Sequence, residues 1–126
     1  MIDSKNINDY ISITIHNGKE DVFSIVEIKA EKMDFSTSPD IKSAIVTYFL
    51  NEAYKKSGAT KHALDMSKVT YITTDGLSAV LLFNRFSEIK GYGRISLVNC
   101  NNTIDRLIKI AQLDTLFEVK SKTGDL

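Results

Sequence analysis

The chain contains no tryptophan, one proline, one cysteine and two histidines in 126 residues. A single cysteine cannot form an internal disulfide, which favours a reducing compartment. Sixteen basic residues balance sixteen acidic ones, so no net charge attracts the chain to nucleic acid or to an anionic membrane. No apolar run approaches the length of a membrane span, and residues 1–5 lack the apolar stretch of a signal peptide. We therefore expect a cytoplasmic protein without a nucleic-acid partner and without direct membrane insertion.

Residue patterns that support catalysis are also missing. His16 and His62 stand alone without the spacing of metal ligands, and no Ser-His-Asp order, glycine-rich phosphate loop or CxxC motif occurs. The neighbours of Cys100 include no cation, so we expect a buried thiol at a strand end and not a reactive one. The sequence thus predicts a protein that is not an enzyme, with no catalytic residues, no metal site and no cofactor.

The length suits one domain with one hydrophobic core, spanning residues 1–126. We expect a loose segment over residues 1–10 and a polar tail over residues 121–126. Ile11, Ile13 and Ile15 alternate with polar residues, which predicts a half-buried strand, and a second strand follows over residues 23–30. The turn signal Asn17-Gly18 between them predicts an antiparallel hairpin with a loop of two or more residues.

A first helix is predicted from Ser38 as N-cap, with Pro39 at the first helical position, to its end at residues 57–58. A short apolar strand over residues 63–66 precedes a second helix from about Asp75 to about Lys90. A third helix capped by Asn102 and a last strand follow. The predicted apolar strand segments after the second helix are residues 95–98 and 116–119.

The order β-β-α-β-α-β-α-β indicates an α/β fold with a mixed sheet, in which the strands after the hairpin pair in parallel. The second helix carries apolar residues on more than one side. Leu77, Val80 and Leu81 form the additional group, which either packs on a neighbouring helix or offers an apolar patch to a partner.

The segment over residues 64–78 reads as a buried strand, a short extended return and a polar corner that opens into a helix. Helix starts present free N–H groups and partial positive charge, which suits an anion or a phosphoryl group. This segment resembles the signature of the STAS domain family, "Asp-Leu-Ser, spacer, apolar, Asp-Ser-Ser/Thr-Gly-Leu". Asp34 also looks like the family's acidic residue after the second strand, and residues 104–113 resemble its third helix.

The resemblance implies an anti-sigma-factor antagonist. Such a protein binds an anti-sigma factor that is also a Ser/Thr kinase, and phosphorylation of the Ser before the Gly abolishes binding in a partner-switching cycle. Here that position is Asp75, which we expect to cap the helix and which could also act as a fixed mimic of the phosphorylated state, since the two roles are compatible. Thr74 is the candidate for an acceptor shifted by one residue. The residues predicted to bind the partner are Asp34, Thr73, Thr74, Asp75, Gly76, Leu77, Ser78 and Leu81.

Other functions remain open. Some stand-alone relatives of this family serve as subunits of lipid or ABC transporters or of signalling scaffolds and are not regulated by phosphorylation, and a small molecule could bind the same corner. Asp65 and Asp34 do not form the adjacent acidic pair of a phosphate receiver, so that enzyme-like interpretation is disfavoured. The sequence does not determine the oligomeric state.

Overall fold

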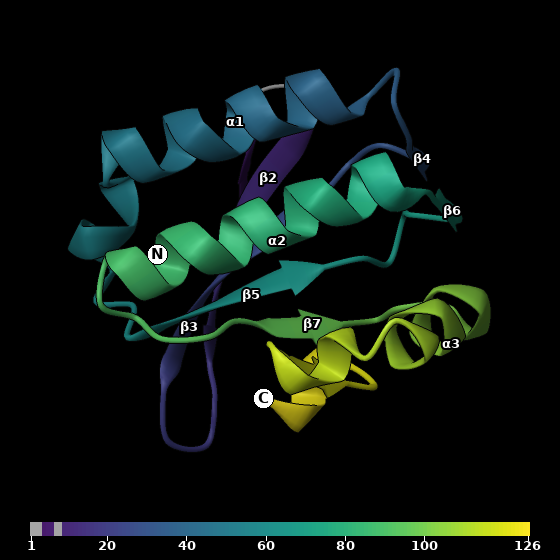
Figure 1. Ribbon diagram of the computed structural model, residues 1–126. Helices are drawn as coiled ribbons and strands as arrows, with labels where there is room; N and C mark the ends of the chain where they lie inside the picture. The colour runs from purple at the N-terminus through teal and green to yellow at the C-terminus, as the bar shows by residue number, and fades with distance from the viewer. Residues whose placement is uncertain (1–3, 7–8) are drawn as a thin grey trace.

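The computed structural model describes residues 4–6 and 9–126 (Figure 1). This part of the chain contains three α-helices, eight strands and three 3-10 turns. The strands are β1 Ser4–Asn6, β2 Ile11–Asn17, β3 Val22–Ile28, β4 Lys32–Met33, β5 Lys61–Asp65, β6 Tyr71–Ile72, β7 Ser96–Val98 and β8 Glu118–Lys120. The helices are α1 Ser38–Asn51, α2 Thr74–Ile89 and α3 Asn102–Ile110, and the 3-10 turns are η1 Ala53–Ser57, η2 Leu113–Thr115 and η3 Thr123–Asp125.

Six strands form one mixed sheet in the order β1-β2-β3-β5-β7-β8. The pairs β1–β2 and β2–β3 are antiparallel, whereas β3–β5, β5–β7 and β7–β8 are parallel. This arrangement confirms the predicted α/β class, the N-terminal hairpin and the parallel pairing of the later strands. The hairpin loop spans residues 18–21 and is closed by a hydrogen bond from the Gly18 N–H to the Asp21 carbonyl oxygen (2.8 Å).

The predicted loose N-terminal segment is wrong in part. Ser4–Asn6 form strand β1, which pairs with β2 from Ser4 opposite Thr14 to Asn6 opposite Ser12. Residues 4–6 are all polar and give no apolar alternation, so this strand could not be predicted from the sequence. Residues 1–3 and 7–8 of that segment lie outside the described part of the chain.

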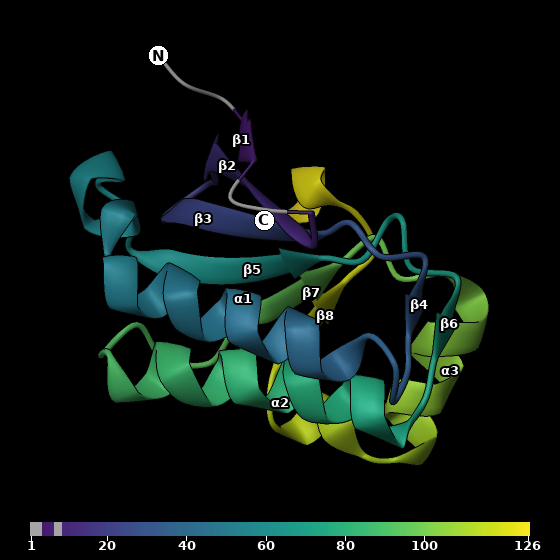
Figure 2. The same ribbon diagram turned by 90° about the horizontal axis from the view of Figure 1, so that it is seen from above.

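Helices α1 and α2 lie side by side across one face of the sheet, and the C-terminal turn lies on the other (Figure 2). The core between the helices and the sheet is built from aliphatic and aromatic side chains. Phe49 on α1 stacks on Phe86 of α2 with ring centroids 5.2 Å apart. Val80 is buried in this core, while Leu77 and Leu81 are partly buried against it.

The ends of two helices differ from the prediction. The N-cap of α1 is Thr37 and not Ser38, which is the first helical residue and whose hydroxyl donates to the Asp75 carbonyl oxygen (2.9 Å). The helix ends at Asn51, where Glu52 adopts a left-handed conformation (φ 57°), and the η1 turn follows to Gly58. The N-cap of α3 is Asn101, whose side-chain oxygen accepts from the Ile104 N–H (2.8 Å), so Asn102 lies inside the helix.

The C-terminal residues are not simply a polar tail. Strand β8 covers Glu118–Lys120, later than the predicted residues 116–119, and η3 follows it. Leu126 is buried on the face of the sheet opposite the helices, in a small cluster with Phe23, Ile25, Ala63 and Val98. The single apolar residue at the end of the segment therefore fixes it to the sheet. Within the described residues, no helix is long and apolar enough to cross a membrane.

Candidate functional site

Two short strands that the sequence did not separate from loops frame the predicted corner. Strand β4 pairs in parallel with β6, with Lys32 opposite Tyr71 and Met33 opposite Ile72. The two strands lie side by side and lead to the start of α1 and α2, respectively, at the same end of the molecule (Figure 2). The ladder therefore brings residues 34–37 next to residues 73–76, although 39 positions separate the paired strands in the sequence.

The start of α2 leaves its first backbone donors free. Thr73 is the N-cap with extended dihedral angles (φ −111°, ψ −179°), and its own N–H donates to the Met33 carbonyl oxygen (2.9 Å). The first helical hydrogen bond runs from the Leu77 N–H to the Thr73 carbonyl oxygen (2.9 Å). The N–H groups of residues 74–76 have no acceptor in the described part of the chain. They present partial positive charge to the surface.

Asp75 is exposed in the first turn of α2, as its second residue. Its carboxylate forms no hydrogen bond or ion pair within residues 9–126, so the interpretation of Asp75 as the N-cap is wrong. The backbone of Asp75 is nevertheless held firmly. Its carbonyl oxygen accepts from the Ser38 hydroxyl (2.9 Å) and from the Ser78 hydroxyl (2.6 Å). The corner thus fixes the backbone of residue 75 and leaves its side chain free.

Gly76 permits the close contact between α2 and strand β4. A Cβ at this position would lie 2.7 Å from the Met33 Cβ and 2.8 Å from the Ile72 Cγ1, and it would overlap the Met33 carbonyl oxygen. No side chain fits there without moving backbone. The glycine of the family signature therefore has a packing role in this chain, next to the exposed carboxylate of Asp75.

Asp34 organises the loop between β4 and α1. One oxygen of its carboxylate, Oδ1, accepts from the Ser36 N–H (3.0 Å), the Ser36 hydroxyl (2.7 Å) and the Thr37 N–H (3.2 Å). The hydrogen bond from the Ser36 hydroxyl is the main cause that lowers the pKa of Asp34 below its ordinary value, and the backbone donors act in the same direction. Asp34 therefore carries negative charge beside the start of α1.

The other predicted residues extend from this corner along α2. Thr74 is exposed at the first helical position, and Thr73 is half-buried against β4. Ser78 and Leu81 are half-buried on the surface of the next two turns and line one common groove. Of the eight predicted residues, Asp34 directly follows β4 and Thr73 directly follows β6. The other six lie in the first half of α2.

Sequence analysis missed three residues of the corner. Phe35, which follows β4, is 77% exposed, and Tyr71 on β6 is 53% exposed. Phe35 could have been found from the sequence, because a large aromatic residue in a loop expected to be polar indicates an exposed apolar contact. The role of Ser38 could not be inferred, because its bond to Asp75 joins positions 37 residues apart.

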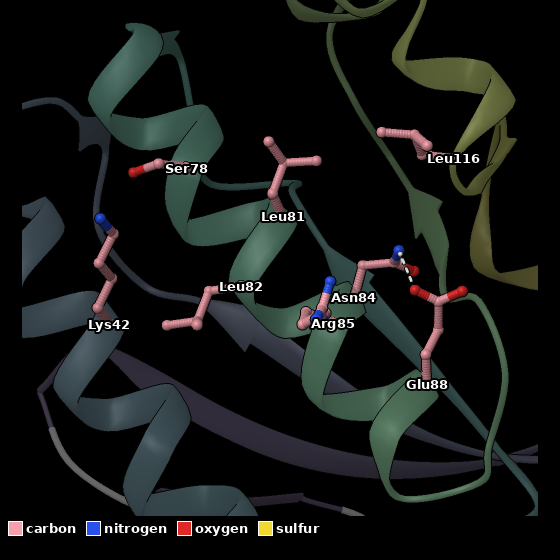
Figure 3. A pocket seen from close by; sticks show the side chains of 8 residues that line it. All are labelled: Lys42, Ser78, Leu81, Leu82, Asn84, Arg85, Glu88 and Leu116. Atoms are coloured by element: carbon pink, nitrogen blue, oxygen red, sulfur yellow. Dashed lines mark hydrogen bonds between the residues drawn. The ribbon is translucent and has the colours of Figure 1, made fainter.

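The groove beside the corner has a volume of about 450 Å³ and follows the exposed side of α2 (Figure 3). Leu81, Leu82 and Leu116 supply its apolar surface, and Lys42 and Arg85 supply positive charge. Figure 3 shows Lys42 on α1 at one side of α2 and Leu116 at the other. The Glu88 carboxylate at the far end accepts a hydrogen bond from the Asn84 amide (3.3 Å).

The residues that were weighed as metal ligands, phosphate acceptors or nucleophiles in the sequence can be located in the fold. Among residues 9–126 and 4–6, no group of three or more His, Cys, Asp or Glu side chains could hold a metal ion. Asp65 accepts from the Ser67 N–H (2.9 Å) and the Asn99 amide (3.0 Å), which stabilises the turn after β5. Burial raises the pKa of the Cys100 thiol to about 12, so the thiol stays protonated and unreactive at neutral pH.

These observations define a small α/β domain with a mixed sheet, whose surface is organised around the start of its second helix. The family model of the STAS domain matches residues 10–126, and the chain belongs to this family. No curated protein sequence matches the chain.

Solved structures share the fold at low sequence identity. An anti-sigma factor antagonist from Mycobacterium paratuberculosis is 20% identical over 96% of this chain and 93% of its own, with a TM-score of 0.66. The anti-sigma factor antagonist SpoIIAA in its unphosphorylated form is 14% identical over 88% of this chain and 89% of its own, with a TM-score of 0.54. The murine anion transporter Slc26a9 is 19% identical over 82% of this chain but only 17% of its own, with a TM-score of 0.65.

Proposed function

We propose that this chain is a non-enzymatic, cytoplasmic regulatory protein of the anti-sigma-factor-antagonist type. Its partner is an anti-sigma factor of the Ser/Thr kinase type, bound at the corner formed by β4, β6 and the start of α2. Membership in the STAS family and the fold shared with antagonists of nearly equal length support this proposal. The observation that carries it is the exposed, unpaired side chain of residue 75 in the first turn of α2.

In this proposal Asp75 is a fixed mimic of the phosphorylated state. A phosphoryl group carries a charge of about −1.5 to −2, whereas a carboxylate carries about −1, so the mimicry is electrostatic and incomplete. The free N–H groups of residues 74–76 stabilise negative charge at this place. The partner surface must therefore accommodate a permanent carboxylate where other antagonists present a neutral hydroxyl. Phe35 supplies an exposed apolar contact beside it.

The test compares the wild-type chain with Asp75→Ser in the presence of each kinase-type anti-sigma factor from the same organism. We expect labelled phosphate from ATP to enter Asp75→Ser, because the new hydroxyl occupies the exposed position of the first helical turn. We expect the wild type to remain unlabelled and to bind the kinase more weakly than unphosphorylated Asp75→Ser, because the carboxylate partly reproduces the charge of the phosphorylated state. The matched control is Asp75→Ala, which removes the charge without providing an acceptor.

Two results would contradict parts of the proposal. Failure of every such kinase to bind either form would reject the kinase partner. Phosphate on Thr74 of the wild type would show that the acceptor has moved by one residue and that Asp75 is not a substitute for it. Thr74→Val distinguishes this case, since it removes the neighbouring hydroxyl while keeping a branched side chain.

A second candidate is a STAS subunit of a lipid or ABC transporter, or of a signalling scaffold, without regulation by phosphorylation. The absence of a hydroxyl at position 75 favours this second function, because a residue without a hydroxyl cannot be phosphorylated by a Ser/Thr kinase. Genes adjacent to the coding sequence distinguish the two functions. A kinase-type anti-sigma factor and a phosphatase support the first, and the other subunits of an ABC transporter support the second.

A further inference from the structure

The exposed side of α2 carries complementary features at its two ends. Asp75 lies in the first turn with an unpaired carboxylate, and Arg85 lies ten residues later, about 15 Å along the helix axis. Leu81 and Leu82 lie between these charges and are only half-buried. An acidic end, an apolar middle and a basic end thus follow one another on one helix.

The cations of this surface are not used within the fold. Neither the Lys42 nor the Arg85 side chain forms a hydrogen bond or an ion pair with any residue in the described part of the chain. Both line the groove over α2, and Figure 3 shows Lys42 beside Leu82 and Ser78. Lys90, by contrast, pairs with Glu52 (3.3 Å). The unpaired charges therefore lie on the same surface as the half-buried leucines.

We propose that two copies of this chain associate through this surface, with their α2 helices antiparallel about a two-fold axis near Leu81. Residues 75 and 85 lie five positions on either side of residue 80. An antiparallel arrangement centred there places Asp75 of each copy opposite Arg85 of the other, and a two-fold axis forms this pair twice. The Leu81 side chains meet near the axis, and Leu82 lies opposite Ser78.

The same geometry avoids a clash of like charges. Glu88 lies three residues beyond Arg85, and in this arrangement it falls opposite position 72, past the start of the other α2 helix. It does not face Asp75, and it is already bonded to Asn84. The arrangement covers the apolar part of the groove and pairs the charges of Asp75 and Arg85 in both copies. A second copy fits this surface because the surface is complementary to itself.

The association does not depend on the proposed function. It covers Asp75 and the first turns of α2, so it would compete with any partner that binds the corner. A monomeric chain could still bind a kinase-type anti-sigma factor, and a self-associating chain could lack such a partner. The two proposals are therefore tested separately.

The experiment is sedimentation velocity on the purified chain from about 1 to about 300 µM, a range that detects weak dimers. We expect the dimer fraction to rise with concentration and to fall when NaCl is raised from about 0.05 M to about 0.5 M, because salt screens the two charge pairs. A wild type that remains monomeric over the whole range would overturn the proposal.

Charge exchange provides the decisive variants. In a dimer of Asp75→Arg, an arginine at position 75 faces Arg85 of the other copy. In a dimer of Arg85→Asp, an aspartate at position 85 faces Asp75. Because like charges repel, we expect each variant to dimerise at least about tenfold more weakly than the wild type. An equimolar mixture of the two restores both opposite-charge pairs, and we expect it to form a heterodimer. Circular dichroism verifies the fold of each variant.

The matched control is Arg106→Asp, which changes an exposed arginine on α3 by the same charge. We expect it to dimerise like the wild type. An equal loss of association in Arg106→Asp would show an effect of net charge and would contradict the α2 interface. Failure of the mixed variants to associate would contradict it as well.

Discussion

His62 is fully buried at the centre of an aromatic cluster formed by α1, η1, α2 and the loop after α2. The ring centroids of Tyr92 and Tyr54 lie 4.8 Å and 4.9 Å from that of the imidazole. Among the residues that the structure describes, neither ring nitrogen has a hydrogen-bond partner, nor does the hydroxyl of Tyr54. Burial therefore lowers the pKa of His62 to about 4, because the interior disfavours the charged imidazolium.

This residue makes the stability of the fold sensitive to acid. The unfolded chain binds a proton at His62 near pH 6.5, whereas the folded chain does so only near pH 4. Stability is therefore fully present above pH 6.5 and decreases as the pH falls toward 4, by up to about 3 kcal/mol. Urea unfolding at several pH values measures this effect.

The contribution of His62 is separated from that of the carboxylates by substitution. We expect His62→Leu to lose most of the decrease between pH 6.5 and pH 4, because leucine binds no proton in either state. His16→Gln on β2 is the matched control, because it replaces the other histidine of the chain outside the aromatic cluster. The same pH dependence in His62→Leu and the wild type would contradict the assignment.

At the level of elements, the contact between β4 and α2 determines the shape of the corner. It depends on Gly76, which allows the first turn of α2 to lie against the Met33 backbone. Ser38 adds a hydrogen bond from the start of α1 to the same turn. Three elements that are distant in sequence thus converge on the backbone of residues 75 and 76.

We expect Gly76→Ala to destabilise the fold by about 2 to 3 kcal/mol, since its methyl group would push on backbone that cannot move cheaply. This steric cost is larger than the stabilisation of about 1 kcal/mol that alanine gives relative to glycine inside a helix. Gly124→Ala is the control, because a Cβ at that position meets no atom within 4 Å. Thermal and urea unfolding of both variants provide the comparison, and equal stabilities would refute the packing role of Gly76.

The sequence predicted the elements with strong local patterns and missed those that depend on distant contacts. The alternation of Ile11, Ile13 and Ile15 identified β2, and the apolar spacing of the second helix located α2 to within one residue at its start. Strands β1, β4 and β6 have only two or three residues each, so their pairing comes from neighbours and not from local periodicity. The exposed position of residue 75 was predictable, but the bonds that hold it were not.

At the scale of the whole molecule, the two faces of the sheet are covered very differently. The helices and a large core cover one face, and a small cluster closed by Leu126 covers part of the other. The backbone of Leu126 also accepts a hydrogen bond from the Lys19 N–H in the hairpin loop (3.4 Å). The last residue therefore joins the end of the chain to the first hairpin.

We expect Leu126→Ala to reduce the free energy of unfolding by about 1 to 2 kcal/mol, because it removes a buried leucine from a thin cluster. Leu50→Ala on α1 is the matched control, since 70% of that side chain is already exposed. It should change stability by less than about 0.5 kcal/mol. A loss for Leu126→Ala no larger than that of the control would show that the cluster contributes little.

The free side chain of residue 75 also has a consequence for the surface charge of the domain. In the described part of the chain, the hydrogen bonds at this position are made by main-chain atoms, so they do not constrain the identity of the residue. A single replacement at position 75 can therefore change the charge that the start of α2 presents to solvent while the domain keeps its architecture.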